Sequence, residues 1–135
     1  MAIVMKKMII LVCFLLLLVG CGEKEMKENN KSIKEDEVSI NKITCDKMKE
    51  LMNDGAILID VREKDEYDER HLDKAINISY TVISQEISKY APNKDNKIIV
   101  YCKSGARSNK AANYLLEAGY TNIYDLGSIN NCDTN

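Results

Sequence analysis

The chain of 135 residues has no tryptophan and only one phenylalanine, one proline and one histidine. A zinc site and a Ser/His/Asp triad both depend on well-placed imidazole groups, so a single histidine argues against each of them. The 19 basic and 21 acidic residues nearly balance, at a net charge of −2, so the chain lacks the positive field that attracts nucleic acid. We therefore expect neither a metal site nor a nucleic-acid partner.

The rest of the composition suits one folded domain. Hydrophobic residues make up 45% of the chain and charged residues 30%, which excludes a wholly disordered protein and a membrane protein with many spans. The length is that of a single domain of ordinary size, and we expect that domain to act as a monomer.

The first 20 residues have the pattern of an export signal. Lys6 and Lys7 precede an unbroken apolar run over 8–19. Such a run spans about 18 Å as a helix, well short of a hydrocarbon core of roughly 30 Å, so it is typical of a signal peptide. Residues 18–21, Leu-Val-Gly-Cys, resemble the lipobox of bacterial lipoproteins, which is cut before a cysteine that carries lipid. A plain signal peptide and an uncleaved anchor are the alternatives.

We accordingly expect three parts: a lipoprotein signal peptide over 1–20, a charged flexible tether over 21–38 and a folded domain over 39–135. Lipid on Cys21 would hold the protein, extracytoplasmic, at the bacterial cell membrane. Residues 22–38 are rich in Lys and Glu and contain no aromatic residue, so they cannot bury enough apolar surface to offset the entropy of ordering. A helix of alternating charges would also act as a spacer.

The folded part alternates between strand and helix patterns. Short apolar runs predict strands at 56–61, 75–78, 97–101 and 122–126. Helical spacing predicts helices at 44–53, 82–90 and 108–118, with a loop or short helix at 62–70. This alternation predicts an α/β fold of three layers, with a central, mainly parallel sheet flanked by helices.

The junction after the strand at 97–101 carries the residues best suited to chemistry. Cys102 follows that strand at its carboxyl end, where ligands bind in parallel α/β sheets. Gly105 lets the chain turn sharply into the next helix, so that loop amides and the helix N-terminus favour a thiolate. Arg107 adds a charged fork that can hold two oxygens of an anion. The alternative is a buried structural cysteine in a tight turn.

These features resemble the single-domain rhodaneses, a family of thiosulfate and related sulfurtransferases. The resemblance runs from about residue 39 to residue 129 and keeps the family's order of motifs. The matching segments are 58–63 with Glu66 and Tyr67, His71 and Leu72 with 75–78, 99–108 with the start of the following helix, and 123–127.

The resemblance implies persulfide chemistry. Cys102 would take the outer sulfur of thiosulfate or a similar small anion, expel sulfite, and pass the sulfur to cyanide or a thiol, without any cofactor. The residues expected to bind the substrate are Lys103, Ser104, Gly105, Ala106 and Arg107. A sulfur-relay or binding module of the same fold, with little free turnover, is the alternative. Phosphatases and arsenate reductases of this fold use a loop one residue longer, whereas the six positions from Cys102 to Arg107 match the sulfurtransferases.

The resemblance also assigns structural roles. Asp60 and Arg62 are expected to tie neighbouring loops together by a salt bridge and backbone hydrogen bonds. His71 is expected to make a structural hydrogen bond, because a cysteine activated by a loop needs no separate base. Asp73 and Lys74 stand where the family usually has Pro-Gly, and Arg70 stands at another usual glycine, which alters a loop away from the nucleophile.

The end of the chain departs most from the family. After Gly127 the family usually has a second glycine and then a tryptophan that packs on the fold, and Cys132 lies near that tryptophan's position. Either the domain compensates for this missing anchor or its stability is lower. Cys45 and Cys132 also have no assigned role. A disulfide between them and a resolving role toward an oxidised or persulfidated Cys102 both remain open.

Overall fold

The computed structural model describes residues 37–132. The predicted signal peptide, the predicted lipid site at Cys21 and nearly all of the predicted tether lie outside these residues, as do residues 133–135. The strands are β1 (Ile40–Lys42), β2 (Ile57–Asp60), β3 (Ile76–Asn77), β4 (Lys97–Cys102) and β5 (Asn122–Ser128). The helices are α2 (Cys45–Asn53), α3 (Lys64–Glu69), α4 (Ile83–Glu86) and α5 (Ala106–Glu117), with 3₁₀ turns η1 (Ile87–Lys89) and η2 (Ile129–Cys132).

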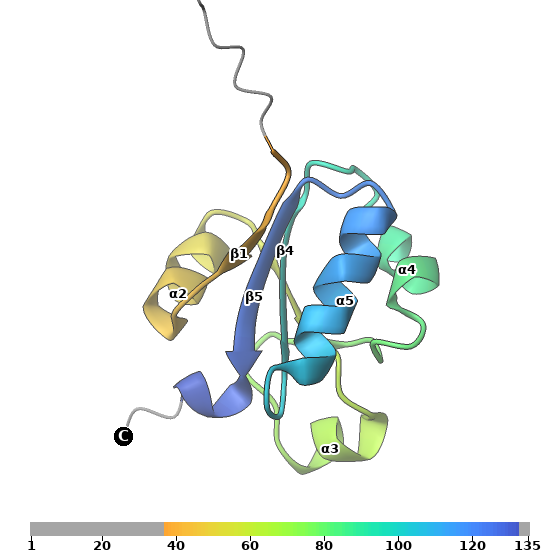
Figure 1. Ribbon diagram of the computed structural model, residues 1–135. Coiled ribbons are helices and arrows are strands. Elements are labelled where there is room, and N and C mark those ends of the chain that lie inside the picture. The colour runs from red at the N-terminus through yellow and green to blue at the C-terminus, as the bar shows by residue number, and fades with distance from the viewer. Residues whose placement is uncertain (1–36, 133–135) are drawn as a thin grey trace, which may run out of the picture. The chain divides into compact units, whose positions relative to one another are not determined.

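The strands of the described part form one sheet in the order β1-β5-β4-β2-β3, and each neighbouring pair is parallel. This confirms the predicted α/β fold with a central parallel sheet. Because the strands are parallel, their carboxyl ends gather at one edge of the sheet. The turn after β4, the helix α3 and the turn η2 lie at that end of the domain (Figure 1).

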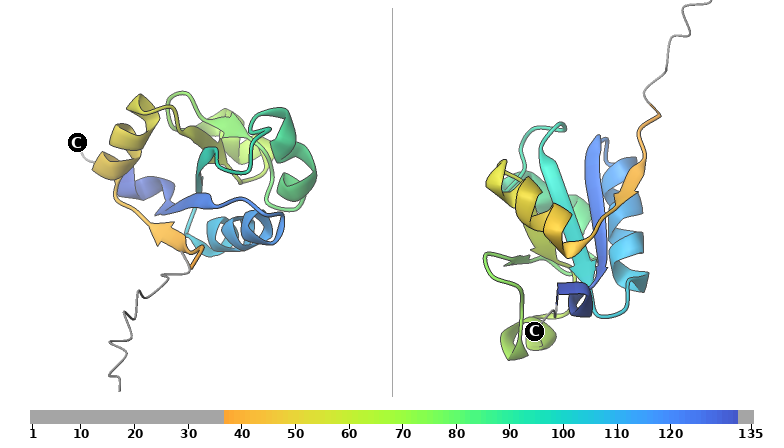
Figure 2. Two further views of the ribbon diagram at one scale, coloured as in Figure 1. Left: turned by 90° about the horizontal axis from the view of Figure 1, so that it is seen from above. Right: turned by 90° about the vertical axis from the view of Figure 1, so that its left-hand side faces the viewer.

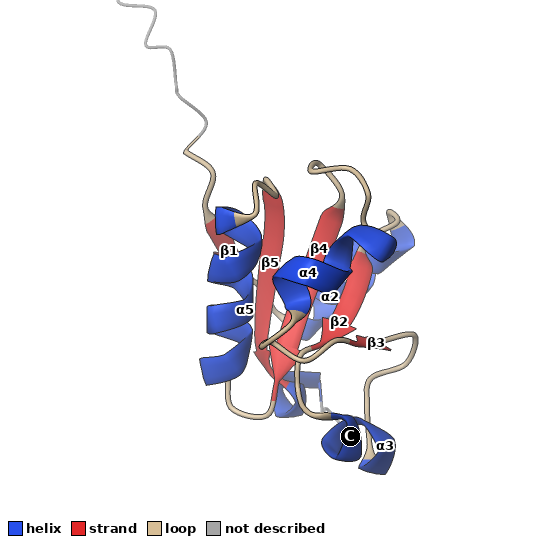
Figure 3. Cartoon of the chain, turned by 90° about the vertical axis from the view of Figure 1, so that its right-hand side faces the viewer, coloured by secondary structure: helices blue, strands red, loops and turns tan. Residues whose placement is uncertain are grey.

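Helices cover both faces of the sheet. The helices α4 and α5 pack on one face and α2 packs on the other (Figures 2 and 3). Side chains of β4 alternate between the two faces, so that Val100 and Cys102 join the cluster under α4 and α5 while Ile99 and Tyr101 join the cluster under α2. A strand buried on both faces accounts for the continuous apolar run that β4 shows in the sequence.

The two longest helices begin and end at residues suited to those positions. The Thr44 side chain caps α2 by accepting a hydrogen bond from the Lys47 amide at 3.3 Å, and Met48 and Leu51 are buried on its inner face. On the other face of the sheet, α5 buries Ala111, Ala112 and Leu115 in the core. Gly119 follows α5 with φ of 93°, the left-handed conformation that glycine commonly adopts just past the end of a helix.

Several element boundaries differ from the sequence prediction. The helix predicted over 82–90 is broken into α4 and η1, the strand predicted over 75–78 is only two residues long, and α5 begins two residues before Ser108. The sequence pattern missed β1, because only Ile40 of its three residues is even half-buried and the strand depends on pairing with β5. It also missed η2. Lys74, at the usual glycine position, adopts φ of 62°, a left-handed conformation that costs a non-glycine residue about 1 kcal/mol.

No helix within residues 37–132 is both long enough and apolar enough to cross a membrane.

Candidate active site

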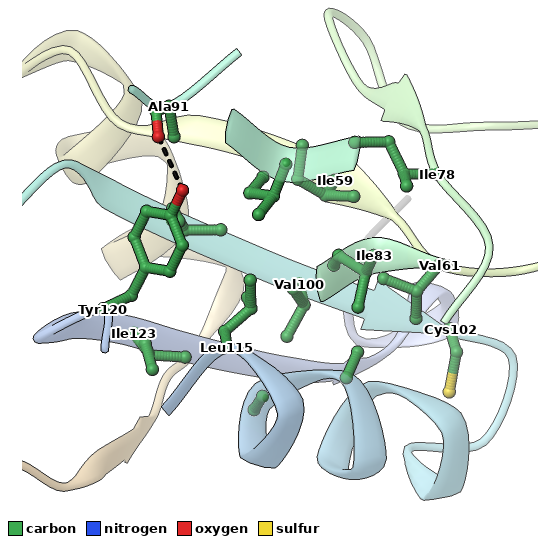
Figure 4. Close-up of a cluster of buried hydrophobic side chains, with 14 residues drawn as sticks. Ile59, Val61, Ile78, Ile83, Ala91, Val100, Cys102, Leu115, Tyr120 and Ile123 are labelled. Carbon is green, nitrogen blue, oxygen red and sulfur yellow. Dashed lines mark hydrogen bonds between the residues drawn. The ribbon is translucent and has the colours of Figure 1, made fainter. Parts of the chain in front are cut away.

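Cys102 is the last residue of β4, and its side chain is buried. Figure 4 shows its sulfur at the end of the strand, beside the start of α5. Only three residues separate Cys102 from the first residue of that helix. The chain closes this short turn at Gly105, which caps α5 with φ of 98°, a left-handed conformation that disfavours any side chain.

The loop amides converge on the sulfur. The Gly105 N–H donates a hydrogen bond to Cys102 Sγ at 3.0 Å. Burial raises the pKa of the Cys102 thiol, but hydrogen bonds from the backbone amides of Ser108, Gly105 and Ser104 lower it by more in total, so the net effect is a lowered pKa. The loop therefore favours the thiolate, the reactive form of cysteine.

Ser108 belongs to this sulfur site, although the sequence pattern did not single it out. Its side chain is buried, its hydroxyl donates to the Gly105 carbonyl at 3.0 Å, and both its amide and its hydroxyl lower the pKa of Cys102. The predicted helix begins at residue 108, so its pattern does not indicate that the Ser108 amide faces the sulfur. A helix that begins at Ala106 instead makes residue 108 the third helical position, where the backbone N–H is free to bind an anion.

The other residues expected to bind the substrate differ in their exposure and in their present contacts. Lys103, Ser104 and Ala106 are exposed at the turn, and the Ser104 amide also contributes to the Cys102 site. Arg107 is half-buried and its guanidinium holds the Glu66 carboxylate at two points, Nη1 to Oε2 at 2.5 Å and Nη2 to Oε1 at 2.8 Å. The structure therefore shows the fork of Arg107 already occupied by a carboxylate from α3.

The pairing of Glu66 with Arg107 also shifts the pKa of each group. The hydrogen bond from Arg107 lowers the pKa of Glu66 to about 2, and the same bond raises the pKa of Arg107. Both groups are thus charged at neutral pH. Any oxyanion that uses the outer nitrogens of Arg107 must compete with this carboxylate.

A cavity of about 210 Å³ lies beside the loop, between α3 and η2. Its charged lining combines Arg62, Arg70 and Lys103 with Glu66 and Glu69. Because Lys103 directly follows Cys102, the exposed Lys103 side chain can attract a small anion toward the sulfur.

Asp60 and Arg62 have the structural role expected of them. Both are buried, Arg62 Nη2 lies 2.7 Å from Asp60 Oδ2, and the Arg62 amide donates to Asp60 Oδ1 at 3.0 Å. Arg62 also donates to the Arg70 carbonyl at 2.5 Å, so the pair ties the end of β2 to the loop after α3. His71 Nδ1 lies 2.8 Å from the Tyr67 carbonyl and its ring stacks on Tyr67, which fits the expected structural role.

Two further cysteines form a disulfide. Cys45, the first residue of α2, is bonded to Cys132, the last residue of η2. Of the alternatives left open by the sequence, the structure shows the disulfide. Within residues 37–132, Cys102 is the only free cysteine, and no group of His, Cys, Asp or Glu side chains there could hold a metal ion.

A buried cysteine at the end of the central parallel strand, wrapped by amides that lead into a helix, defines an α/β domain built to hold a thiolate. The sequence model of the rhodanese-like domain matches residues 44–132, and the chain belongs to this family.

Relatives and solved structures agree with this assignment. The chain is 35% identical over 71 residues to the thiosulfate sulfurtransferase PspE of Escherichia coli K12, covering 53% of this chain and 68% of PspE. It is 36% identical over 70 residues to the thiosulfate sulfurtransferase GlpE of Coxiella burnetii, covering 52% of this chain and 64% of GlpE. The structure of a rhodanese with anions from E. coli has a TM-score of 0.57 at 31% identity and covers 60% of this chain and 95% of that chain.

The chain is also similar to proteins whose names describe a different activity. The chain is 32% identical over 80 residues to a tRNA uridine(34) hydroxylase of Photorhabdus laumondii, covering 56% of this chain and 23% of that protein. The domain is thus shared among proteins of different activity, and the activity of this chain has to be argued from its own site.

Proposed function

We propose that this protein is a sulfurtransferase that moves a sulfane sulfur through a persulfide on Cys102. The observation that carries the proposal is the Cys102 thiol held under converging loop amides that lower its pKa. The similarity to thiosulfate sulfurtransferases of E. coli and C. burnetii supports the same chemistry. No step of it requires a cofactor.

The proposed reaction has two displacement steps. The Cys102 thiolate attacks the outer sulfur of thiosulfate, the S–S bond breaks, and sulfite leaves with the bonding electrons. The enzyme then carries a persulfide anion, Cys102–S–S⁻. In the second step cyanide or a thiolate attacks the outer sulfur, leaves as thiocyanate or a new persulfide, and returns the Cys102 thiolate.

The loop stabilises the charge that each step produces. The amides of Ser104, Gly105 and Ser108 already lower the pKa of Cys102, and the same donors suit a persulfide anion on that residue. Lys103 and Arg107 supply positive charge for the sulfonate oxygens of the donor. Because Glu66 occupies Arg107, we propose that the dianionic donor displaces Glu66 as it binds.

The length of the loop from Cys102 to Arg107 bears on whether the protein could be a phosphatase or an arsenate reductase instead. Six positions from Cys102 to Arg107 form a tight ring of amides, and a larger tetrahedral centre would need a wider one. This disfavours a phosphatase or an arsenate reductase.

A sulfur-relay module is the second candidate, and a specific observation favours it. Cys102 is fully buried and Arg107 is already paired, so a free small donor has to open the site. A partner protein that presents its own persulfide could supply the binding energy for such a change.

The turnover of thiosulfate and cyanide to thiocyanate tests the proposal. A sulfurtransferase shows sustained, two-step kinetics that are abolished by Cys102→Ser, a variant that removes only the thiol. One equivalent of thiocyanate without further turnover favours the relay. Equal thiocyanate production by wild type and Cys102→Ser would show that Cys102 is not the sulfur carrier.

We also propose that the protein is a lipoprotein, anchored through Cys21 outside the cytoplasm and acting there as a monomer on small sulfur compounds. The pattern of residues 1–21 supports the anchor, and the Cys45–Cys132 disulfide suits an oxidising compartment. Cys21→Ser should abolish lipid labelling and release the protein from membranes, with Cys102→Ser as the matched cysteine control. Unchanged labelling in Cys21→Ser would contradict the anchor.

A further inference from the structure

The Cys45–Cys132 disulfide lies in the wall of an open cavity of about 320 Å³. This cavity is separate from the one beside Lys103, and its apolar lining includes Met48, Met52 and Leu72. The side chains of Lys49 and Lys74, both exposed, complete one side of it. A disulfide placed in the wall of a cavity can be reached by a thiol that enters the cavity.

The two sulfur atoms of this bond are not equivalent. Cys45 is 8% exposed and begins α2, directly after the Thr44 cap. A helix N-terminus stabilises a thiolate, so Cys45 is the better leaving group. Cys132 is half-buried, in a 3₁₀ turn near the end of the chain, and is therefore the more accessible sulfur. Attack on Cys132 with departure of the Cys45 thiolate is the favoured direction.

The disulfide is also connected to the Cys102 loop. Cys132 ends η2, which follows directly from β5, and Ser128 at the end of β5 is the register partner of Cys102. The Ser128 hydroxyl donates to the Lys103 carbonyl at 2.6 Å, and the Asn130 amide donates to the same hydroxyl at 3.2 Å. The bond to Cys45 thus fixes the turn η2, whose backbone holds the residue that supports the Cys102 loop.

We propose that Cys45–Cys132 is a thiol–disulfide exchange site for an external dithiol, and that reduction of this bond loosens the Cys102 loop through η2 and Ser128. One thiolate of the dithiol attacks Cys132 Sγ, the protein S–S bond breaks, and the electron pair stays on Cys45. The second thiol of the reagent then resolves the mixed disulfide. The dithiol is oxidised to a disulfide, and the protein gains two thiols. No step uses the chemistry proposed for Cys102.

The exchange is tested on the folded full chain with two thiols, glutathione and dithiothreitol. Glutathione should give a mixed disulfide that peptide mass spectrometry locates on Cys132, and dithiothreitol should expose both Cys45 and Cys132 to alkylation without denaturant. A mixed disulfide on Cys45, or a bond that reacts only after unfolding, would overturn the exchange site.

The coupling is tested by hydrogen exchange of the oxidised and reduced full chain. At labelling times short enough that 57–60 in β2 stays protected in both forms, reduction should speed exchange over 103–108 and 128–132 by about tenfold. Ser128→Ala, with the disulfide intact, should speed exchange over 103–108 alone. The double variant Cys45→Ser/Cys132→Ser should match the reduced wild type without any reductant.

Two outcomes would overturn the coupling. Unchanged exchange over 103–108 after confirmed reduction would show that the loop does not depend on the disulfide. Acceleration over 103–108 that appears only at times when 57–60 also loses protection would show global unfolding instead of a local effect. Neither readout involves sulfur transfer, so these results are independent of whether the protein has sulfurtransferase activity.

Discussion

Removing the Cys45–Cys132 bond should be among the most destabilising changes at residues outside the Cys102 loop. The bond joins residues 87 positions apart in the sequence. In the chain-entropy description, a closed loop of that length lowers the free energy of folding by about 4.6 kcal/mol. The double variant Cys45→Ser/Cys132→Ser should lose roughly that amount.

The estimated contribution of the disulfide can be compared with that of the family tryptophan. Loss of a buried tryptophan typically costs about 3 to 5 kcal/mol, which is a large share of the roughly 5 to 15 kcal/mol of an ordinary domain. Cys132 stands near the position of that tryptophan and fixes the C-terminal turn covalently to α2. On these figures, we expect the disulfide to offset the missing aromatic anchor with an effect of similar size.

Urea unfolding, followed by circular dichroism, measures the difference. The double variant should unfold at a lower urea concentration, and the reduced wild type should behave like it. Cys102→Ser is the matched control, because it removes a thiol without removing a cross-link. A double variant whose free energy of unfolding lies within about 1 kcal/mol of the wild type would show that the cross-link contributes little to stability.

Three further predictions concern Glu66 and Ser108. Glu66→Gln frees Arg107 from its carboxylate and should lower the KM for thiosulfate and the inhibition constant of sulfate several-fold. Asp65→Asn removes the same charge from the same helix, at an exposed residue that does not line the cavity, and should change neither. The pKa of Glu66 is about 2 in the folded protein, against an ordinary value of 4.5. The stability that this carboxylate contributes is therefore present above pH 4.5 and is lost as the pH falls toward 2. Acid unfolding of wild type and Glu66→Gln should show this loss. Ser108→Ala removes a hydroxyl that lowers the pKa of Cys102, so the pH midpoint of iodoacetamide alkylation at Cys102 should move upward; an unchanged midpoint would contradict the role given to Ser108.

The sequence was most informative where local pattern and burial agree. The apolar run of β4 is buried on both faces, and the turn from Cys102 through Gly105 has its glycine at the left-handed position. Each of these features depends on residues that are close together in the chain. For that reason the fold class, the central strand and the position of Cys102 could all be predicted.

The features that the sequence did not show depend on distant residues. Glu66 meets Arg107 across 41 positions, and Cys45 meets Cys132 across 87. No local periodicity reports such contacts. The pairing of Glu66 with Arg107 matters most for function. Because the Arg107 guanidinium is already bound to a carboxylate, an anionic donor has to compete with Glu66 for it.

The mass of the intact protein after incubation with thiosulfate shows whether Cys102 carries the sulfur. Wild type should gain one sulfur atom, the peptide containing Cys102 should carry it, and cyanide should remove it. Cys102→Ser should gain none. Wild type that stays unmodified, or a sulfur found on Cys45 or Cys132 instead, would contradict the assignment of Cys102 as the persulfide carrier.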